Sequence, residues 1–191
     1  MNRMRMLTLL AAALLSGCGS VMVSQPMGER PVVLDPENWE GTWASDEIVM
    51  LTTVLDSQAG VLQAAWLERY EEGARFETVT GEVRQTGDWY FLSMAHEPPK
   101  TDDEPETDAV AGPPEYLWAR IDNNGRRAII WWPDLEQFRE AVQEGRIAGQ
   151  VKEDSDVLLG TLDAAQIESI NSPSGNLMNW AEPLVLIRIG N

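Results

Sequence analysis

The chain has 191 residues and a formal net charge of −17 at pH 7, with 31 acidic side chains against 14 basic ones. This length suits one domain with a real hydrophobic core and is short for two, and the charge excludes a surface that attracts nucleic acid or anionic lipid. One cysteine and one histidine exclude an internal disulfide and a zinc site built from several histidines.

Residues 1–17 have the three-part order of a secretory signal peptide. Arg3 and Arg5 precede an apolar run over residues 7–15, and small residues follow the run up to Cys18. The run is too short for a membrane-spanning helix, which needs roughly 20 apolar residues. We therefore expect residues 1–17 to be cleaved from the mature protein.

The tetrapeptide Leu15-Ser16-Gly17-Cys18 resembles the lipobox of bacterial lipoproteins. The resemblance implies a diacylglyceryl thioether on Cys18, cleavage before it and an N-acyl lipid on the new amino group. A thiolate is the nucleophile that such an alkylation needs, and several acyl chains are required for stable anchoring. The alternative is an ordinary secretory leader that contains a cysteine.

The residues after Cys18 indicate which membrane would hold the lipid-anchored protein. In lipoproteins an aspartate directly after the modified cysteine favours the inner membrane, whereas Gly19 and Ser20 stand there in this chain. The resemblance therefore implies a lipid anchor in the outer membrane, with the protein facing the periplasm.

Residues 18–35 are small, polar and proline-containing without periodicity, which predicts a lipidated N-terminal tether and a globular domain over 36–191. Most of that domain predicts short strands, because β-branched or aromatic runs alternate with Gly, Asn, Asp or Pro. These runs cover residues 47–56, 60–70, 74–85, 88–96, 115–122, 126–133, 146–154, 156–162 and 183–190. Short connections between them favour an antiparallel meander.

Two segments predict short helices, over residues 134–145 and 163–171. Asp134 with Gln137, and Asp163 with Gln166, have the spacing of a helix N-cap and its third residue, and Gly145 is suited to end the first helix. The predicted fold class is therefore α+β and mostly antiparallel β: one β-rich domain, a barrel or curved sheet, with two short helices.

The Asn124-Gly125 pair predicts a two-residue hairpin turn, because both central positions of that turn must tolerate positive φ. The turn predicts Trp118 opposite Trp131. Strand alternation then forms a clean apolar face from Leu117, Ala119, Ile121, Ala128, Ile130 and Trp132. The other face carries Tyr116, Trp118, Arg120, Ile129 and Trp131.

We interpret Tyr116, Trp118, Arg120 and Trp131 as a candidate binding surface, because aromatic side chains with one cation suit recognition. Two alternatives remain open from the sequence. This face lines the interior of a small barrel, or both faces are buried and one lies under a helix.

Gly41 and Trp43, in the stretch NWEGTW, resemble the Gly-x-Trp start of the first strand in lipocalin-like barrels. The resemblance implies a packed tryptophan near one end of a barrel. The two predicted helices depart from the single late helix of that family.

Motifs for catalysis are absent from the sequence. His96 is the only histidine, and there is no Gly-x-Ser-x-Gly elbow, Ser-x-x-Lys pair or phosphate-binding glycine loop. The acidic, proline-rich stretch 97–115 predicts a mobile loop. Its carboxylates could gather calcium weakly, but the stretch lacks the glycine and ligand spacing of a calcium loop. We therefore expect neither an enzyme nor a metal site.

These patterns predict a lipid-anchored cell-envelope lipoprotein that acts as a non-enzymatic binding or structural module. The expected partners are the membrane, through the lipids on Cys18, and an envelope protein; no nucleic acid is expected. The alternative is a carrier or sensor that holds a small apolar ligand in a lipocalin-like barrel.

Overall fold

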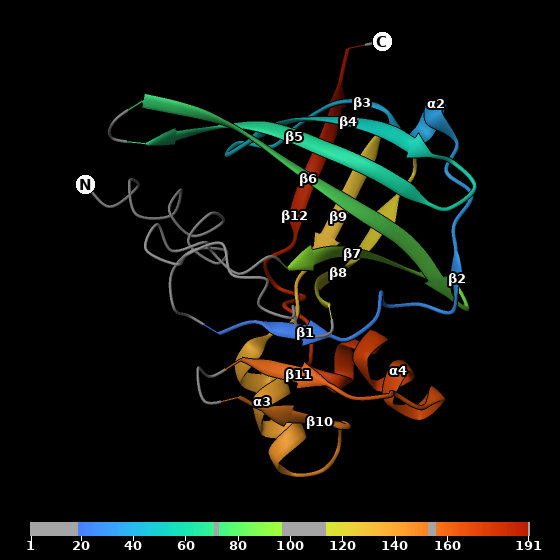
Figure 1. Cartoon of the computed structure of the whole chain (residues 1–191), viewed down its shortest axis with the longest axis vertical. Helices are drawn as coiled ribbons and strands as arrows, with labels where there is room; N and C mark the ends of the chain where they lie inside the picture. Colours follow the sequence, from blue (N-terminus) through green and yellow to red (C-terminus); the bar gives the residue numbers. More distant parts are fainter. Residues whose placement is uncertain (1–18, 71–72, 97–113, 153–155, 191) are drawn as a thin grey trace, which may run out of the picture.

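The computed structural model describes residues 19–70, 73–96, 114–152 and 156–190. Eight of its strands form a closed antiparallel barrel, because β8 pairs with β7 on one side and with β9 on the other (Figure 1). In chain order these strands are β3 (Gly41–Ala44), β4 (Val49–Asp56), β5 (Val61–Tyr70), β6 (Gly73–Thr86), β7 (Trp89–His96), β8 (Glu115–Asn123), β9 (Arg127–Trp131) and β12 (Leu184–Ile189).

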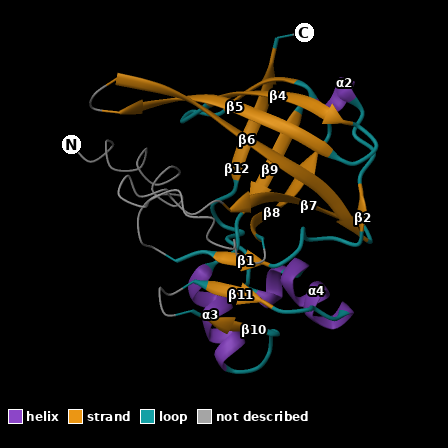
Figure 2. Ribbon diagram, in the orientation of Figure 1, coloured by secondary structure: helices purple, strands orange, loops and turns teal. Residues whose placement is uncertain are grey.

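A smaller unit, which we call the lobe, packs on the outside of the barrel. It consists of β1 (Val21–Val23), α3 (Leu135–Gln143), β10 (Gly149–Val151), β11 (Val157–Leu159) and α4 (Ala164–Asn171). β1 joins it to the barrel, since it pairs antiparallel with β8 and parallel with β11. Figure 2 shows α3 and α4 in this lobe, while the one-turn helix α2 (Pro36–Trp39) lies at the barrel. The short β2 (Arg30–Pro31) pairs with β6, and a 3₁₀ turn, η1 (Pro173–Gly175), follows α4.

The predicted fold class is confirmed: the domain is β-rich, with antiparallel strands and short helices. Both predicted helices are present with the expected caps. Asp134 accepts a hydrogen bond from Gln137 N at 3.1 Å, and Asp163 forms a reciprocal capping box with Gln166. Local side-chain chemistry therefore sets where these two helices begin.

The predicted tether over residues 18–35 is wrong for its described part. Val21, Met22 and Val23 form a fully buried strand, and Leu34 is 0 % exposed. A strand of three residues is too short for a periodic pattern, and its partners β8 and β11 are far away in sequence. The folded domain therefore begins directly after Ser20.

The predicted loop 97–115 lies almost wholly outside the described residues. Glu115, at its predicted end, is instead the first residue of β8. There its carboxylate pairs with Lys152 Nζ at 2.6 Å, so this residue belongs to the folded sheet.

The predicted hairpin register is wrong by two residues. Trp131 pairs with Arg120, not with Trp118. Among the described non-glycine residues, only Asn176 has a positive φ, so Asn124 does not adopt the conformation that a two-residue turn requires. Its side-chain oxygen instead accepts from the backbone N–H groups of Arg126 and Arg127, at 3.1 and 2.9 Å, which opens a longer loop. A shift of two residues leaves every side chain on its predicted face.

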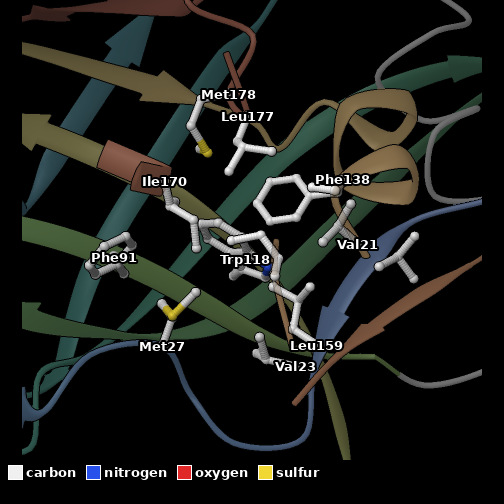
Figure 3. Close-up of a cluster of buried hydrophobic side chains, with 13 residues drawn as sticks. Val21, Val23, Met27, Phe91, Trp118, Phe138, Leu159, Ile170, Leu177 and Met178 are labelled. Carbon is white, nitrogen blue, oxygen red and sulfur yellow. The ribbon is translucent and has the colours of Figure 1, made fainter. Parts of the chain in front are cut away.

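The molecule has two hydrophobic cores. One fills the barrel interior and includes Trp39, Trp43, Leu62, Ile121 and Leu186. The other lies between the lobe and the outer faces of β7 and β8. Figure 3 shows this second core around Trp118, with Phe91 on one side and Phe138 of α3 on the other. None of the helices in the described ranges is long and apolar enough to cross a bilayer.

Candidate functional site

The four predicted surface residues lie together on the outside of the barrel, but Trp118 is not at the surface. Its side chain is 1 % exposed and makes edge-to-face contacts with Phe91 and Phe138, at ring-centre distances of 6.0 and 5.8 Å. The lobe therefore buries this residue under a helix. Trp118 is part of the core and cannot contact a partner in the folded protein.

Tyr116 and Trp131 are half-buried and pack against the same core. Arg120, on the same strand as Tyr116 and opposite Trp131, has a different environment. Three tryptophan rings surround its guanidinium carbon, with ring centres at 4.0 Å for Trp89, 4.7 Å for Trp131 and 5.0 Å for Trp180. We call these four residues the arginine cage.

Different parts of the fold supply the cage. Trp131 is the direct register partner of Arg120 on β9, whereas Trp89 begins the neighbouring strand β7. Trp180 comes from the irregular segment before β12, and its ring also contacts Trp131 at 5.7 Å. Sequence analysis missed Trp89 and Trp180. The alternation in β7 offered a signal for Trp89, but no local pattern brings Trp180 to this face.

The guanidinium of Arg120 is partly removed from water. Burial lowers its pKa, and the charge of nearby Asp122 opposes that shift; an arginine still remains protonated at neutral pH. Its Nε is buried without a hydrogen-bond acceptor, and the structure records no hydrogen bond or ion pair from its other nitrogens to the described residues. Trp180 Nε1, in the same cage, is also buried without an acceptor.

Trp43 is a packed residue of the barrel. It is 2 % exposed and donates from Nε1 to Thr52 Oγ1 at 2.8 Å. Arg188 of the last strand, β12, lies over its ring at 5.8 Å. Gly41 has φ +134°, and a Cβ there would lie 3.0 Å from Arg188 Nε, so the glycine leaves room for this arginine.

The surface of the described residues has hollows at two places. One, of about 240 Å³, is at the α2 end and is lined by Val32, Val33, Asp35, Asn38, Trp39, Tyr90, Asn123 and Asn124. The other, of about 360 Å³, lies at the lobe and is lined by Ser24, Gly149, Gln150, Leu158, Leu159 and Gly160. Neither contains a residue of the arginine cage.

Two polar side-chain atoms of the barrel have no hydrogen-bond partner in the described residues. Trp132 Nε1 and Glu77 Oε1 are buried without a hydrogen-bond partner. Arg75 Nε is 3.7 Å from Glu77 Oε1, too far for a hydrogen bond. Glu77 pairs with Trp66 and follows the alternation that points into the barrel. Trp132 lies two residues after the inward-facing Ile130, which pairs with Leu184, and packs against the barrel core.

A second surface feature lies on the outside of the barrel. Large apolar side chains project into solvent from β4, β5, β6 and β12, and we call this set the outer apolar face. Its members are Val49, Leu51, Leu55, Leu67, Phe76, Val185, Ile187 and Ile189. Phe76 is 64 % exposed and Leu51 50 %, which is unusual for such residues unless a partner covers them.

His96 is the last residue of β7, opposite Glu115. In the described ranges no group of three His, Cys, Asp or Glu side chains could hold a metal ion. The carboxylates of the 97–113 stretch lie outside those ranges.

Comparison with models of protein families, with curated proteins and with solved structures finds no match to this chain. The function must therefore be argued from the sequence and from these surfaces.

Proposed function

We propose that this chain is an envelope lipoprotein, anchored through lipids on Cys18 in the outer membrane and facing the periplasm, whose domain binds another envelope protein without catalysis. The leader and the lipobox support the anchor. The outer apolar face is the observation that carries the binding role.

The outer apolar face is continuous and uncharged across five strands. Ile189, Thr42, Leu51, Ala65 and Thr78 are successive register partners across β12, β3, β4, β5 and β6. No charged residue occurs in this row, although 24 % of the chain is charged. An uncharged apolar surface on so acidic a chain favours a protein interface.

Charged residues border this face on both sides. Arg127 of β9 pairs with Ile187 at one edge, and Glu82 of β6 pairs with Val61 at the other. A polar rim around an apolar centre is typical of a protein–protein interface.

The position of the face relative to the anchor favours a protein over the bilayer as its occupant. β4, at the centre of the face, is four strands away from β8 in either direction around the barrel, and β8 carries the lobe. Val21 of the lobe follows Cys18 after only Gly19 and Ser20. An anchor at Cys18 therefore holds the lobe near the membrane and turns the outer apolar face away from it.

The proposed partner is a protein with an apolar, uncharged surface. A second copy is disfavoured because two chains that each carry a net charge of −17 repel one another. Anchoring supports even a weak contact, since two proteins held in one thin layer meet at high effective concentration.

Site-specific photo-crosslinking in the native envelope tests this role. A photoreactive residue at Leu51 should capture a discrete second protein, whereas one at exposed Gln143 on α3 should not. The variant Leu51→Lys should lose the interaction and keep its fold, because an exposed substitution changes stability by only about 0.5 kcal/mol. Capture of lipid alone, of a second copy, or equal capture from both positions contradicts the proposal.

The anchor has its own test. Cys18→Ser should abolish incorporation of labelled palmitate and release the protein from the membrane fraction. Unchanged lipid labelling in that variant would contradict lipidation at Cys18.

Trp132 Nε1, which is buried inside the barrel without a hydrogen-bond partner, favours a second candidate function, the carrier of a small ligand. Native mass spectrometry of the Cys18→Ser chain, purified from the periplasm, distinguishes this function. An added small mass that is lost in Trp132→Phe supports a carrier, and a bare chain supports the protein-binding role.

A further inference from the structure

We infer that the arginine cage is a binding site for a carboxylate group on a flat or apolar ligand. This site is centred on β8, whereas the outer apolar face is centred on β4, and the two share no residue, so the inference goes beyond the protein-binding role and does not depend on it.

The first argument is the hydrogen-bonding capacity of the cage. Arginine and tryptophan side chains have N–H donors and no acceptor, so all four residues of the cage can only donate. Arg120 Nε and Trp180 Nε1 are buried and have no acceptor in the described residues. These two atoms are closed to an external molecule, whereas the terminal guanidinium nitrogens of Arg120 are not among the buried atoms, so they are the donors that an external acceptor can reach.

The second argument is charge. The nearby Asp122 acts on Arg120 through its charge, but the structure records no hydrogen bond between them. Arg84, which lies opposite Phe91 on the neighbouring strand, already pairs with Glu82 at 2.7 Å. Arg120 is therefore a partly buried cation that no described carboxylate binds directly, and an anion would satisfy both its charge and its terminal N–H donors.

The third argument is shape. A guanidinium is a planar fork that matches the two oxygens of a carboxylate. The rings of Trp89, Trp131 and Trp180 stand within 4.0 to 5.0 Å of its centre and provide apolar walls. These walls suit a flat or aliphatic group next to the carboxylate, and one guanidinium matches the single charge of that group.

Nuclear magnetic resonance of the ¹⁵N-labelled Cys18→Ser chain, titrated with benzoate, tests the inference directly. We expect the Arg120 Nε–H signal and the indole N–H signals of Trp89, Trp131 and Trp180 to shift. Trp43 and Arg188 form an internal control, because they pair in the same way at the barrel and have their own acceptors. Their signals should stay in place.

Benzamide, which has the shape of benzoate without its charge, is the matched control ligand and should bind at least about tenfold more weakly, as expected for loss of a charged hydrogen bond. Arg120→Lys should weaken benzoate binding by about tenfold, and Arg120→Met should abolish it. The benzoate titration of the chain with an unchanged cage tests for the carboxylate site even if an Arg120 variant fails to fold.

Three results would overturn the inference. They are unmoved cage signals at saturating benzoate, equal shifts with benzamide, and equal shifts at Trp43. Tighter binding of phenyl phosphate than of benzoate would overturn the carboxylate assignment and point to a phosphate group.

Discussion

Two arginines of this barrel lie over tryptophan rings, and only one of them has hydrogen-bond acceptors. Arg188 covers Trp43 at 5.8 Å and donates to the carbonyl oxygens of Glu37 and Gly125, the latter at 3.3 Å. Arg120 lies closer to three rings and makes no recorded hydrogen bond within the described residues.

This difference separates a structural role from a binding role. The acceptors of Arg188 are the carbonyl oxygens of Glu37 in α2 and of Gly125 in the loop that joins β8 and β9. This arginine therefore holds one end of the barrel together. Arg120 connects no two segments through hydrogen bonds within the described residues, although it lies near three tryptophan rings and Arg188 lies near one. Aromatic contact alone therefore does not identify a structural arginine; the presence of main-chain acceptors does.

The largest expected effect on the free energy of unfolding comes from replacing Trp43, the ring that Arg188 covers. Trp43→Ala removes a buried ring and its hydrogen bond to Thr52, and we expect it to lower the free energy of unfolding by about 3–5 kcal/mol. Trp131→Ala removes a half-buried ring of the arginine cage and is the matched variant. It should lower the free energy of unfolding clearly less than Trp43→Ala does. Urea unfolding of both variants measures the difference, and equal losses would contradict it.

Arg188→Met should have the next largest effect. It removes the charged donor from Glu37 and Gly125, and we expect a loss of about 1.5–3 kcal/mol in the free energy of unfolding. The measurement is again urea unfolding. A loss below that of Arg120→Met would show that Arg188 does not hold the barrel end.

Arg120→Met should have the smallest effect on stability. It loses cation–π contacts, each worth about 0.5–1 kcal/mol, and gains from no longer burying an unpaired Nε. We expect the free energy of unfolding to change by less than about 1 kcal/mol while benzoate binding is lost. A large destabilisation in urea would assign Arg120 a structural role instead.

Some of the fold could be predicted because it depends on neighbouring residues. The faces of β8 and β9 follow from alternation, and the starts of α3 and α4 follow from Asp134 and Asp163, whose acceptors lie within three residues of their donors. The hairpin register could not be predicted. The loop at Gly125 packs against Asn38, whose Oδ1 would lie 2.3 Å from a Cβ at that glycine, and Asn38 is far away in sequence.

The residues of the candidate site also fall into those that the sequence could predict and those that it could not. Arg120 and Trp131 could be predicted, because one hairpin carries both. Trp118 was placed on the correct face, but only the packing of α3 on that face decides that it is buried. Trp180 was missed because it joins the cage from a segment without regular structure, more than 40 residues beyond Trp131 in the chain.

By itself the sequence determined most of the strands, the helix caps and the alternating faces, since each depends on residues close together in the chain. Only the tertiary structure decided that the sheet closes, that β1 is a core strand and that Arg120 stands among three tryptophans. These features depend on contacts between segments distant in sequence, whose energies no local pattern records. A strand of three residues and a single tryptophan in a loop acquire their roles from their partners.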